Sequence, residues 1–103
     1  MALPPNVTSL EVSRASNTSL HVVVTLEKDT VDYYVINVYR AEDNRTEDDV
    51  IRSERIPFNG SEASASFSSL TPGERYAVVA FTMIDDVTGE PSEIINVVGW
   101  LQI

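Results

Sequence analysis

Short apolar segments recur along the chain, and clusters of polar and turn-forming residues separate them. In several segments apolar and polar positions alternate with the two-residue period of a strand, and no window sustains the period of an amphipathic helix. The pattern predicts strands at residues 7–12, 20–25, 32–40, 50–56, 63–67, 76–83 and 94–98. We therefore expect an all-β protein of seven strands.

The segments between these strands are short. We expect turns or loops at residues 16–19, 27–30, 41–49 and 85–91, and the third of these is strongly charged. Such connections join antiparallel neighbours and leave no room for the helical crossovers that parallel strands require. Seven short strands at this spacing predict two antiparallel sheets packed into a sandwich.

The composition is that of one globular domain. Of the 103 residues, 43% are hydrophobic, and there is no cysteine for a disulfide or a thiolate metal site. No apolar segment is long enough to enter a membrane, and no signal peptide follows Met1, so we expect a targeting signal to lie outside this chain. We expect one domain over residues 1–103, with its core at about 5–98 and a tail or linker at 99–103.

The chain is acidic. Sixteen Asp and Glu residues against seven Lys and Arg give a net charge of -9. Nucleic acid and anionic lipid are therefore poor partners, because both need a basic surface. The charge favours solubility, and we expect the isolated domain to be monomeric.

One segment carries a family signature. The run Leu70-Thr71-Pro72-Gly73-Glu74-Arg75-Tyr76 resembles the junction of strands E and F in fibronectin type III domains. In that family the leucine closes the core, proline and glycine turn the chain, and the tyrosine packs as a tyrosine corner with its hydroxyl bonded to nearby backbone. The remaining strands fit the family order, so the resemblance covers nearly the whole chain. Its structural signature residues here are Leu70, Pro72, Gly73 and Tyr76.

The resemblance implies an immunoglobulin-like antiparallel β-sandwich with sheets ABE and C′CFG. It implies a non-catalytic module that binds proteins in the extracellular part of a receptor or adhesion protein, such as a receptor-type protein tyrosine phosphatase. Two alternatives stay open: a structural spacer that sets the length of an ectodomain, and an accessory domain of a secreted microbial enzyme.

One position departs from the family pattern. Members usually carry a buried tryptophan at the third inward position of strand B, where this chain has Val24. Valine fills much less volume, so we expect the core to be repacked, with Phe67 or Trp100 as the candidates for filling the space.

Four asparagines match the N-glycosylation sequon, Asn-X-Ser/Thr. They are Asn6, Asn17, Asn44 and Asn59. The Asn, Ser and Thr content would give about one match by chance. The excess favours an extracellular glycoprotein, whereas the alternative is that these residue types are simply common in turns.

The third and sixth strands are apolar on both sides, although a solvated face should alternate to polar residues. They also contain no sequon. If Tyr34, Ile36 and Val38 face inward, we expect a candidate interaction face on the other side. Its residues are Tyr33, Val35, Tyr39, Val79, Phe81 and Met83. The alternatives are that a neighbouring domain, strand C′ or the tail Trp100–Leu101 covers this face, or that the register is displaced by one residue.

The loop between the last two strands offers Asp85 and Asp86 as candidate contacts. The chain has no Arg-Gly-Asp, and Ile84-Asp85 is only weakly similar to the apolar-Asp motifs that some integrins bind. Asp29, Asp85, Asp86 and Glu90 could approach one another, but calcium needs six to eight oxygens and no spaced acidic motif supplies them. We expect no metal site and read these residues as solvated charge.

Catalytic residues are scarce. His21 is the only histidine, is predicted on the outward side of its strand, and has no cysteine partner. No strained serine turn or oxyanion hole is indicated, and the isolated glycines form no phosphate loop. We expect no catalytic residue, no cofactor and no enzymatic activity.

Overall fold

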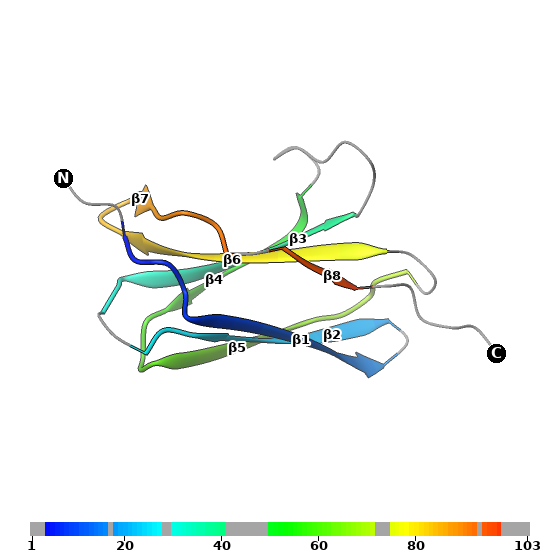
Figure 1. Ribbon diagram of the computed structural model, residues 1–103. Helices are drawn as coiled ribbons and strands as arrows, with labels where there is room; N and C mark the ends of the chain where they lie inside the picture. The colour runs from blue at the N-terminus through cyan, green and yellow to red at the C-terminus, as the bar shows by residue number, and fades with distance from the viewer. Residues whose placement is uncertain are drawn as a thin grey trace.

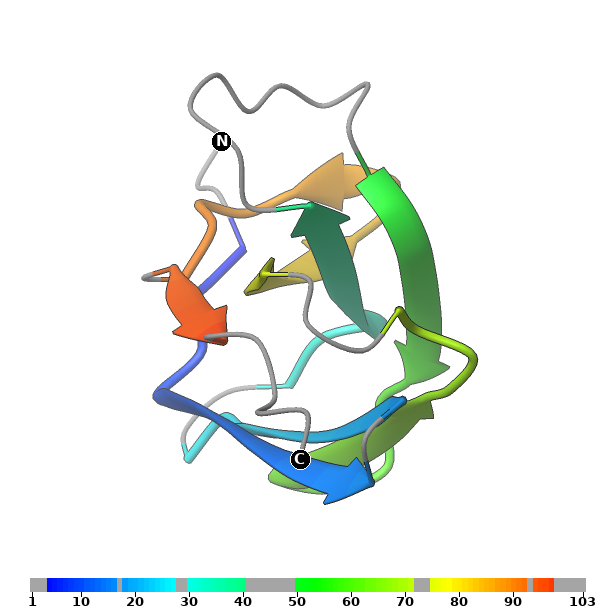
Figure 2. The same ribbon diagram turned by 90° about the vertical axis from the view of Figure 1, so that its right-hand side faces the viewer.

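The computed structural model describes residues 4–16, 18–27, 30–40, 50–71, 75–92 and 94–97, arranged in two facing antiparallel sheets (Figures 1 and 2). The first sheet has three strands in the order β1-β2-β5. These are β1 (Ser9–Ser16), β2 (Ser19–Thr25) and β5 (Glu62–Phe67). The predicted ABE sheet is thereby confirmed.

The second sheet corresponds to the predicted C′CFG sheet. Its order is β4-β3-β6-β7, and β8 also pairs with β6. The strands are β3 (Tyr33–Arg40), β4 (Val50–Pro57), β6 (Tyr76–Ile84), β7 (Val87–Thr88) and β8 (Ile95–Val97). The strand predicted at 94–98 is thus preceded by a separate short strand, β7, on the same edge of the sheet.

The segment between β7 and β8 still follows β6. Gly89 N donates to Thr82 O at 2.9 Å, and Ser92 N donates to Ala80 O at 2.7 Å. Between these two hydrogen bonds the edge segment spans three residues, from 89 to 92, whereas β6 spans only two, from 82 to 80. This additional residue is the signature of a β-bulge, and it explains why the edge strand is interrupted.

The expected loop at 85–91 is wrong in its first half, because β6 and β7 form a tight hairpin. Its turn consists of Asp85 and Asp86, with φ angles of 51° and 66°. Positive φ at both central residues is typical of a type I′ turn. Asp85 N donates to Asp32 Oδ2 at 2.9 Å, which supports the turn. The usual Asn-Gly cue is missing here, so the pattern alone did not reveal the hairpin.

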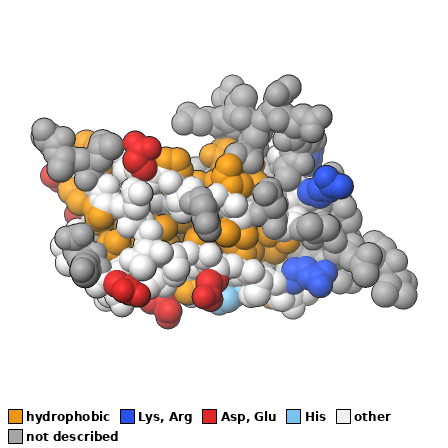
Figure 3. Space-filling view, in the orientation of Figure 1, with side chains coloured by type: hydrophobic (Ala, Val, Ile, Leu, Met, Phe, Trp, Pro, Cys, Tyr) orange, Lys and Arg blue, Asp and Glu red, His pale blue; other side chains and the backbone are white. Residues whose placement is uncertain are grey.

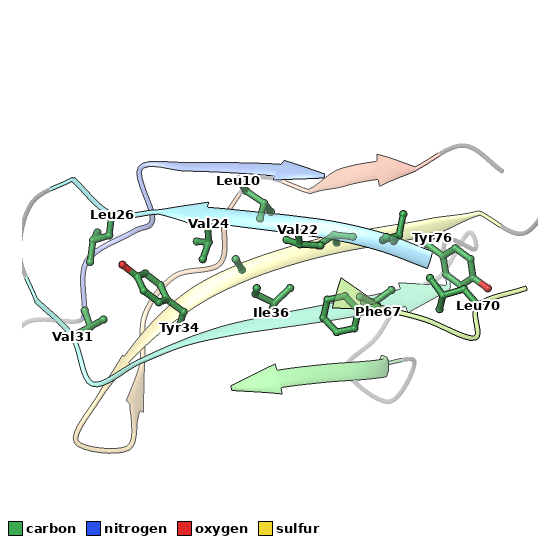
Figure 4. Close-up of a cluster of buried hydrophobic side chains, with 14 residues drawn as sticks. Leu10, Val22, Val24, Leu26, Val31, Tyr34, Ile36, Phe67, Leu70 and Tyr76 are labelled. Carbon is green, nitrogen blue, oxygen red and sulfur yellow. The ribbon is translucent and has the colours of Figure 1, made fainter. Parts of the chain in front are cut away.

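The core lies between the sheets and contains the inward positions of the strands (Figure 4). Tyr34, Ile36 and Val38 of β3 are fully buried, as the alternation predicted. Thr82 is the one buried polar side chain in the described part of the chain, and its Oγ1 donates to Pro5 O at 2.6 Å. This bond holds the segment before β1 against the second sheet.

Gly89 also fixes this segment. A Cβ at position 89 would lie 2.8 Å from the carbonyl oxygen of Pro4, closer than real Cβ contacts allow. The bulged edge and the lead-in to β1 can therefore approach this closely only because residue 89 has no side chain.

The neighbourhood of Val24 shows how the core is repacked. Phe67, one of the two predicted fillers, pairs with Leu20, whereas Val24 pairs with Ala63 at the opposite end of β5. Phe67 is four residues beyond Ala63 in β5. At about 3.3 Å per residue, it lies roughly 13 Å along the strand from the position opposite Val24. The Phe67 expectation is therefore wrong, and Trp100 lies outside the described residues.

Tyr34 supplies aromatic volume at the Val24 end of the core instead. Its hydroxyl donates to Gly60 O at 2.9 Å, just before β5, and its ring lies 5.7 Å from that of Phe58. Figure 4 shows Tyr34 pointing across the sandwich between Val24 and Val31. Burial raises the pKa of the Tyr34 hydroxyl above its ordinary value.

Candidate interaction surface

The pairing of β3 with β6 places the six predicted face residues on one outer surface. Tyr33 pairs with Met83, and Val35 pairs with Phe81. Antiparallel partners share a face, and the alternate residues of both strands lie in the core. Further along, Val79 pairs with Asn37, and Tyr39 pairs with Ala77. We name this outer surface of β3 and β6 the CF face.

The CF face is less exposed than a fully solvated sheet. Val35 and Val79 are only 8% and 6% exposed, and the other four predicted residues are half-buried. Val35 lies between Phe81 and Arg55 in the sheet, so its neighbours shield it. The half-buried side chains of Tyr33, Tyr39, Phe81 and Met83 therefore remain available for contact with a partner.

The middle of the CF face is hollow. A concavity of about 470 Å³ is lined by residues of β3, β4 and β6 and of the bulged edge. They are Asn37, Tyr39, Val50, Ser53, Val79, Phe81, Thr88, Gly89 and Pro91. Its lining mixes apolar side chains with the polar groups of Asn37, Ser53 and Thr88 in about equal measure.

Two polar features were missed by the sequence reasoning. Ser53 Oγ donates to Asn37 Oδ1 at 2.7 Å within the concavity, and the Arg55 guanidinium lies 5.2 Å from the centre of the Tyr33 ring. The second geometry is a cation–π contact. Both depend on the register between β3 and β4, which no local pattern encodes.

Acidic residues border the CF face on the β7 side. Glu90 is exposed between the lining residues Gly89 and Pro91, and Asp85 and Asp86 are exposed at the tip of the hairpin. In Figure 3 the visible acidic side chains lie toward the β7 end and along the three-stranded sheet, while the visible Lys and Arg side chains lie toward the opposite end. The predicted loop contacts thus belong to a rigid hairpin beside the CF face.

Two of the four sequon asparagines can be located. Asn6 and Asn59 are exposed, and neither belongs to β3 or β6. Asn17 and Asn44 lie outside the described residues. Neither located asparagine lines the concavity, although Asn6 and Pro91 together line a second hollow beside it.

The signature residues form a tyrosine corner. Tyr76 is 1% exposed, and Thr71 N donates to its hydroxyl oxygen at 2.8 Å. Leu70 is buried, and its N–H donates to Thr18 O at 2.8 Å. Pro72 and Gly73 lie outside the described residues.

The described residues offer little chemistry of their own. They contain no group of three or more His, Cys, Asp or Glu side chains that could hold a metal ion. His21 Nδ1 lies 3.4 Å from Ser66 Oγ on the outer face of the three-stranded sheet, which is a long hydrogen bond. No helix in this part of the chain is long and apolar enough to cross a bilayer.

The fold and the surface together define an immunoglobulin-like sandwich, a class that presents binding surfaces on its sheets and loops. The model of the fibronectin type III domain family matches residues 4–98. The chain therefore belongs to this family, as the signature from Leu70 to Tyr76 predicted. Domains of this family are typical of extracellular adhesion proteins and receptors, and they are generally non-catalytic.

The fold is similar to those of several solved structures. The FN1–FN3 domains of chicken CNTN1 match with a TM-score of 0.77 at 20% identity, over 93% of this chain and 32% of theirs. The fn3 domain of human contactin 1 gives 0.75 at 20% identity, over 92% and 76%. A structure described as a myokine gives 0.72 at 16% identity, over 93% and 97%.

These identities show the fold alone. The chain spans about a third of the length of the chicken CNTN1 structure. No curated protein matches the chain.

Proposed function

We propose that this domain is a non-catalytic, extracellular protein-interaction module that binds a protein partner through the CF face. The observation that carries the proposal is the concavity on the outer surface of a sheet, where Tyr39, Phe81 and Pro91 lie beside the polar side chains of Asn37, Ser53 and Thr88. A sheet surface with no partner is normally polar, so the half-buried aromatic side chains of Tyr39 and Phe81 in this concavity support a contact surface.

Charge indicates the kind of partner. Glu90 lies between two lining residues of the concavity, Asp85 and Asp86 lie at the tip of the neighbouring hairpin, and the net charge is -9. An apolar side chain flanked by Lys or Arg would fill the concavity and complement this border. Such complementarity mainly accelerates association and excludes acidic competitors.

The binding surface is tested by a charge placed on the CF face. Phe81→Asp is expected to weaken binding at least about tenfold, because a carboxylate would be buried against the partner. The measurement is binding of the chain to an array of cell-surface ectodomains. The matched control is Val23→Asp, which makes the same kind of change at a half-buried outward position of β2 in the other sheet.

Thermal unfolding of both variants shows whether the fold is retained. Ectodomains that bind the unaltered chain and Val23→Asp but lose Phe81→Asp support the proposal. An array without any binder, or binders that tolerate Phe81→Asp, would instead favour a structural spacer. One observation favours that second function. Pro5 accepts a hydrogen bond from Thr82 near one end of β6, and Val97 pairs with Tyr76 at the other end, so the two described ends lie at opposite ends of this strand and suit end-to-end linkage.

The extracellular location is tested by glycan attachment. For the chain secreted from eukaryotic cells, we expect N-glycosidase to lower the intact mass and to convert asparagine to aspartate at two or more of the four sequons. Exposed Asn6 and Asn59 are the first candidates. A folded, secreted product with all sequons unmodified would remove this support for the location and raise the microbial alternative.

A further inference from the structure

The second hollow, which Asn6 and Pro91 help to line, lies in the seam between the edges of the two sheets. Its volume is about 340 Å³, and its walls are the start of the chain up to β1 and the segment before β8. Figures 1 and 2 show these two segments side by side at one edge of the sandwich. We name this space the seam hollow. It is lined by Asn6, Val7, Thr8, Ser9, Leu10, Pro91 and Ser92.

One complete glycosylation sequon belongs to this lining. Asn6, Val7 and Thr8 are its three residues, and Asn6 is exposed. A sugar joined to Asn6 Nδ2 therefore begins at the seam hollow. Asn59, the other located sequon asparagine, lines neither the seam hollow nor the concavity of the CF face.

The backbone is anchored on both sides of Asn6. Pro5 O accepts the hydrogen bond from Thr82 Oγ1 at 2.6 Å, which ties the chain to the second sheet. Thr8 N donates to Thr25 O at 2.6 Å, which ties it to the first sheet. Because the attachment point is held in place, a sugar on Asn6 loses little further freedom when it enters the hollow.

The opposite wall of the seam hollow is anchored as well. Ser92 N donates to Ala80 O at 2.7 Å, and Ala80 N donates to Ser92 Oγ at 3.0 Å. Both walls are thus fixed by hydrogen bonds to strands of the sandwich. The hollow is preformed, as small-ligand sites usually are.

The lining matches the chemistry of N-acetylglucosamine, the first sugar of an N-glycan. Leu10 belongs to the core, Val7 packs against it, and Pro91 adds apolar surface, while Thr8 and Ser9 supply hydroxyl groups. The sugar likewise combines apolar C–H faces and an acetyl methyl group with hydroxyl and amide groups. Its binding would remove apolar surface of the seam from water and would leave its polar groups beside hydroxyl partners and solvent.

We propose that the seam hollow binds the first N-acetylglucosamine of a glycan on Asn6, and that this sugar covers the core at the seam and stabilises the fold. This goes beyond attachment, because a sugar that is only attached would extend into solvent. The inference rests on the extracellular location proposed above and is independent of binding at the CF face.

The position of the sugar is tested by NMR on the chain secreted from eukaryotic cells and trimmed with an endoglycosidase to one N-acetylglucosamine at each occupied site. We expect nuclear Overhauser contacts between the acetyl methyl group on Asn6 and the methyl groups of Val7 or Leu10. A sugar on Asn59 serves as the internal control and should show no contact with these methyl groups.

The stabilisation is tested with Asn6→Gln, which removes the sugar and keeps an amide. In the trimmed form, the unaltered chain should unfold at least about 2 °C above Asn6→Gln, whereas the two should unfold together when both are produced without glycans. Asn59→Gln is the matched control, because its sugar lies in open solvent. Loss of that sugar should move the midpoint by less than about 1 °C after the same glycan-free comparison.

The outcomes separate this inference from the proposed location. A glycan on Asn6 that lacks the expected contacts, or whose removal costs no stability, would overturn the inference and leave the extracellular location intact. A secreted chain with glycans only at other sequons would do the same. If all four sequons stay unmodified in a folded, secreted product, the inference fails together with the support for the location.

Discussion

Replacing Tyr34 by alanine is expected to lower the free energy of unfolding by about 3–5 kcal/mol, the cost typical of removing a buried aromatic ring. Tyr34 is fully buried and spans the sandwich to Gly60, and its ring packs near Phe58. Truncation would leave a cavity at the level of Val24 and Ala63, where both neighbours are too small to fill it. Chemical denaturation at pH 7 measures the loss.

The control is Tyr34→Phe, which keeps the ring and removes the hydroxyl. Because Gly60 is exposed, water can replace the lost donor, and we expect a cost of about 0.5–1.5 kcal/mol. A loss as large as that of Tyr34→Ala would mean that the hydrogen bond, and not the ring volume, dominates.

A comparison of the unaltered chain with Tyr34→Phe also tests the pKa of Tyr34, which burial raises above the ordinary value of 10.0. The folded state then holds the phenolic proton more tightly than the unfolded state does. This contribution to stability is complete below the unfolded pKa and is lost as the pH rises through the folded pKa. Above about pH 10 we expect the unaltered chain to lose more stability than Tyr34→Phe does. Equal losses would contradict the assignment.

Replacing Val24 by tryptophan is expected to destabilise the domain by about 1–3 kcal/mol, although tryptophan is the usual residue of the family at this position. Val24 is fully buried, and Tyr34 and Phe58 already provide aromatic volume at this end of the core. An indole there would force side chains from their preferred rotamers or separate the sheets.

Val24→Ile is the matched control, since it adds one methylene with the same branching and should change stability by less than about 1.5 kcal/mol. Thermal and denaturant unfolding of both variants give the comparison. Stabilisation by tryptophan would show that the core still holds space for the family residue.

The double variant Tyr34→Ala, Val24→Trp should be destabilised by less than the sum of the two single variants, because the indole would occupy the volume that Tyr34 vacates.

Much of the fold could be predicted because burial imposes a two-residue period on a strand. The alternation of Tyr34, Ile36 and Val38 located both the strand and its inward face, and the Leu70–Tyr76 signature located the tyrosine corner. The same period indicated the CF face, since apolar residues filled the outward positions as well. That this face binds a partner remains a proposal.

Features that depend on distant segments could not be predicted in this way. The replacement of the missing tryptophan volume by Tyr34, and not by Phe67, follows from how far each residue lies along its strand from Val24. The Asp85–Asp86 hairpin depends on positive φ angles and on the carboxylate of Asp32, which lies far away in the sequence. Neither feature leaves a local pattern.

The sequence by itself determined the seven main strands, the inward side of the central strands and the family to which the chain belongs, because hydrophobic period and signature spacing are local properties. Only the tertiary structure decided the register between strands, the concavity that joins Asn37, Ser53 and Phe81, and the hairpin that joins β6 to β7. These depend on hydrogen-bond pairing and packing between segments distant in the chain, where the free energy of each contact is set by its partner.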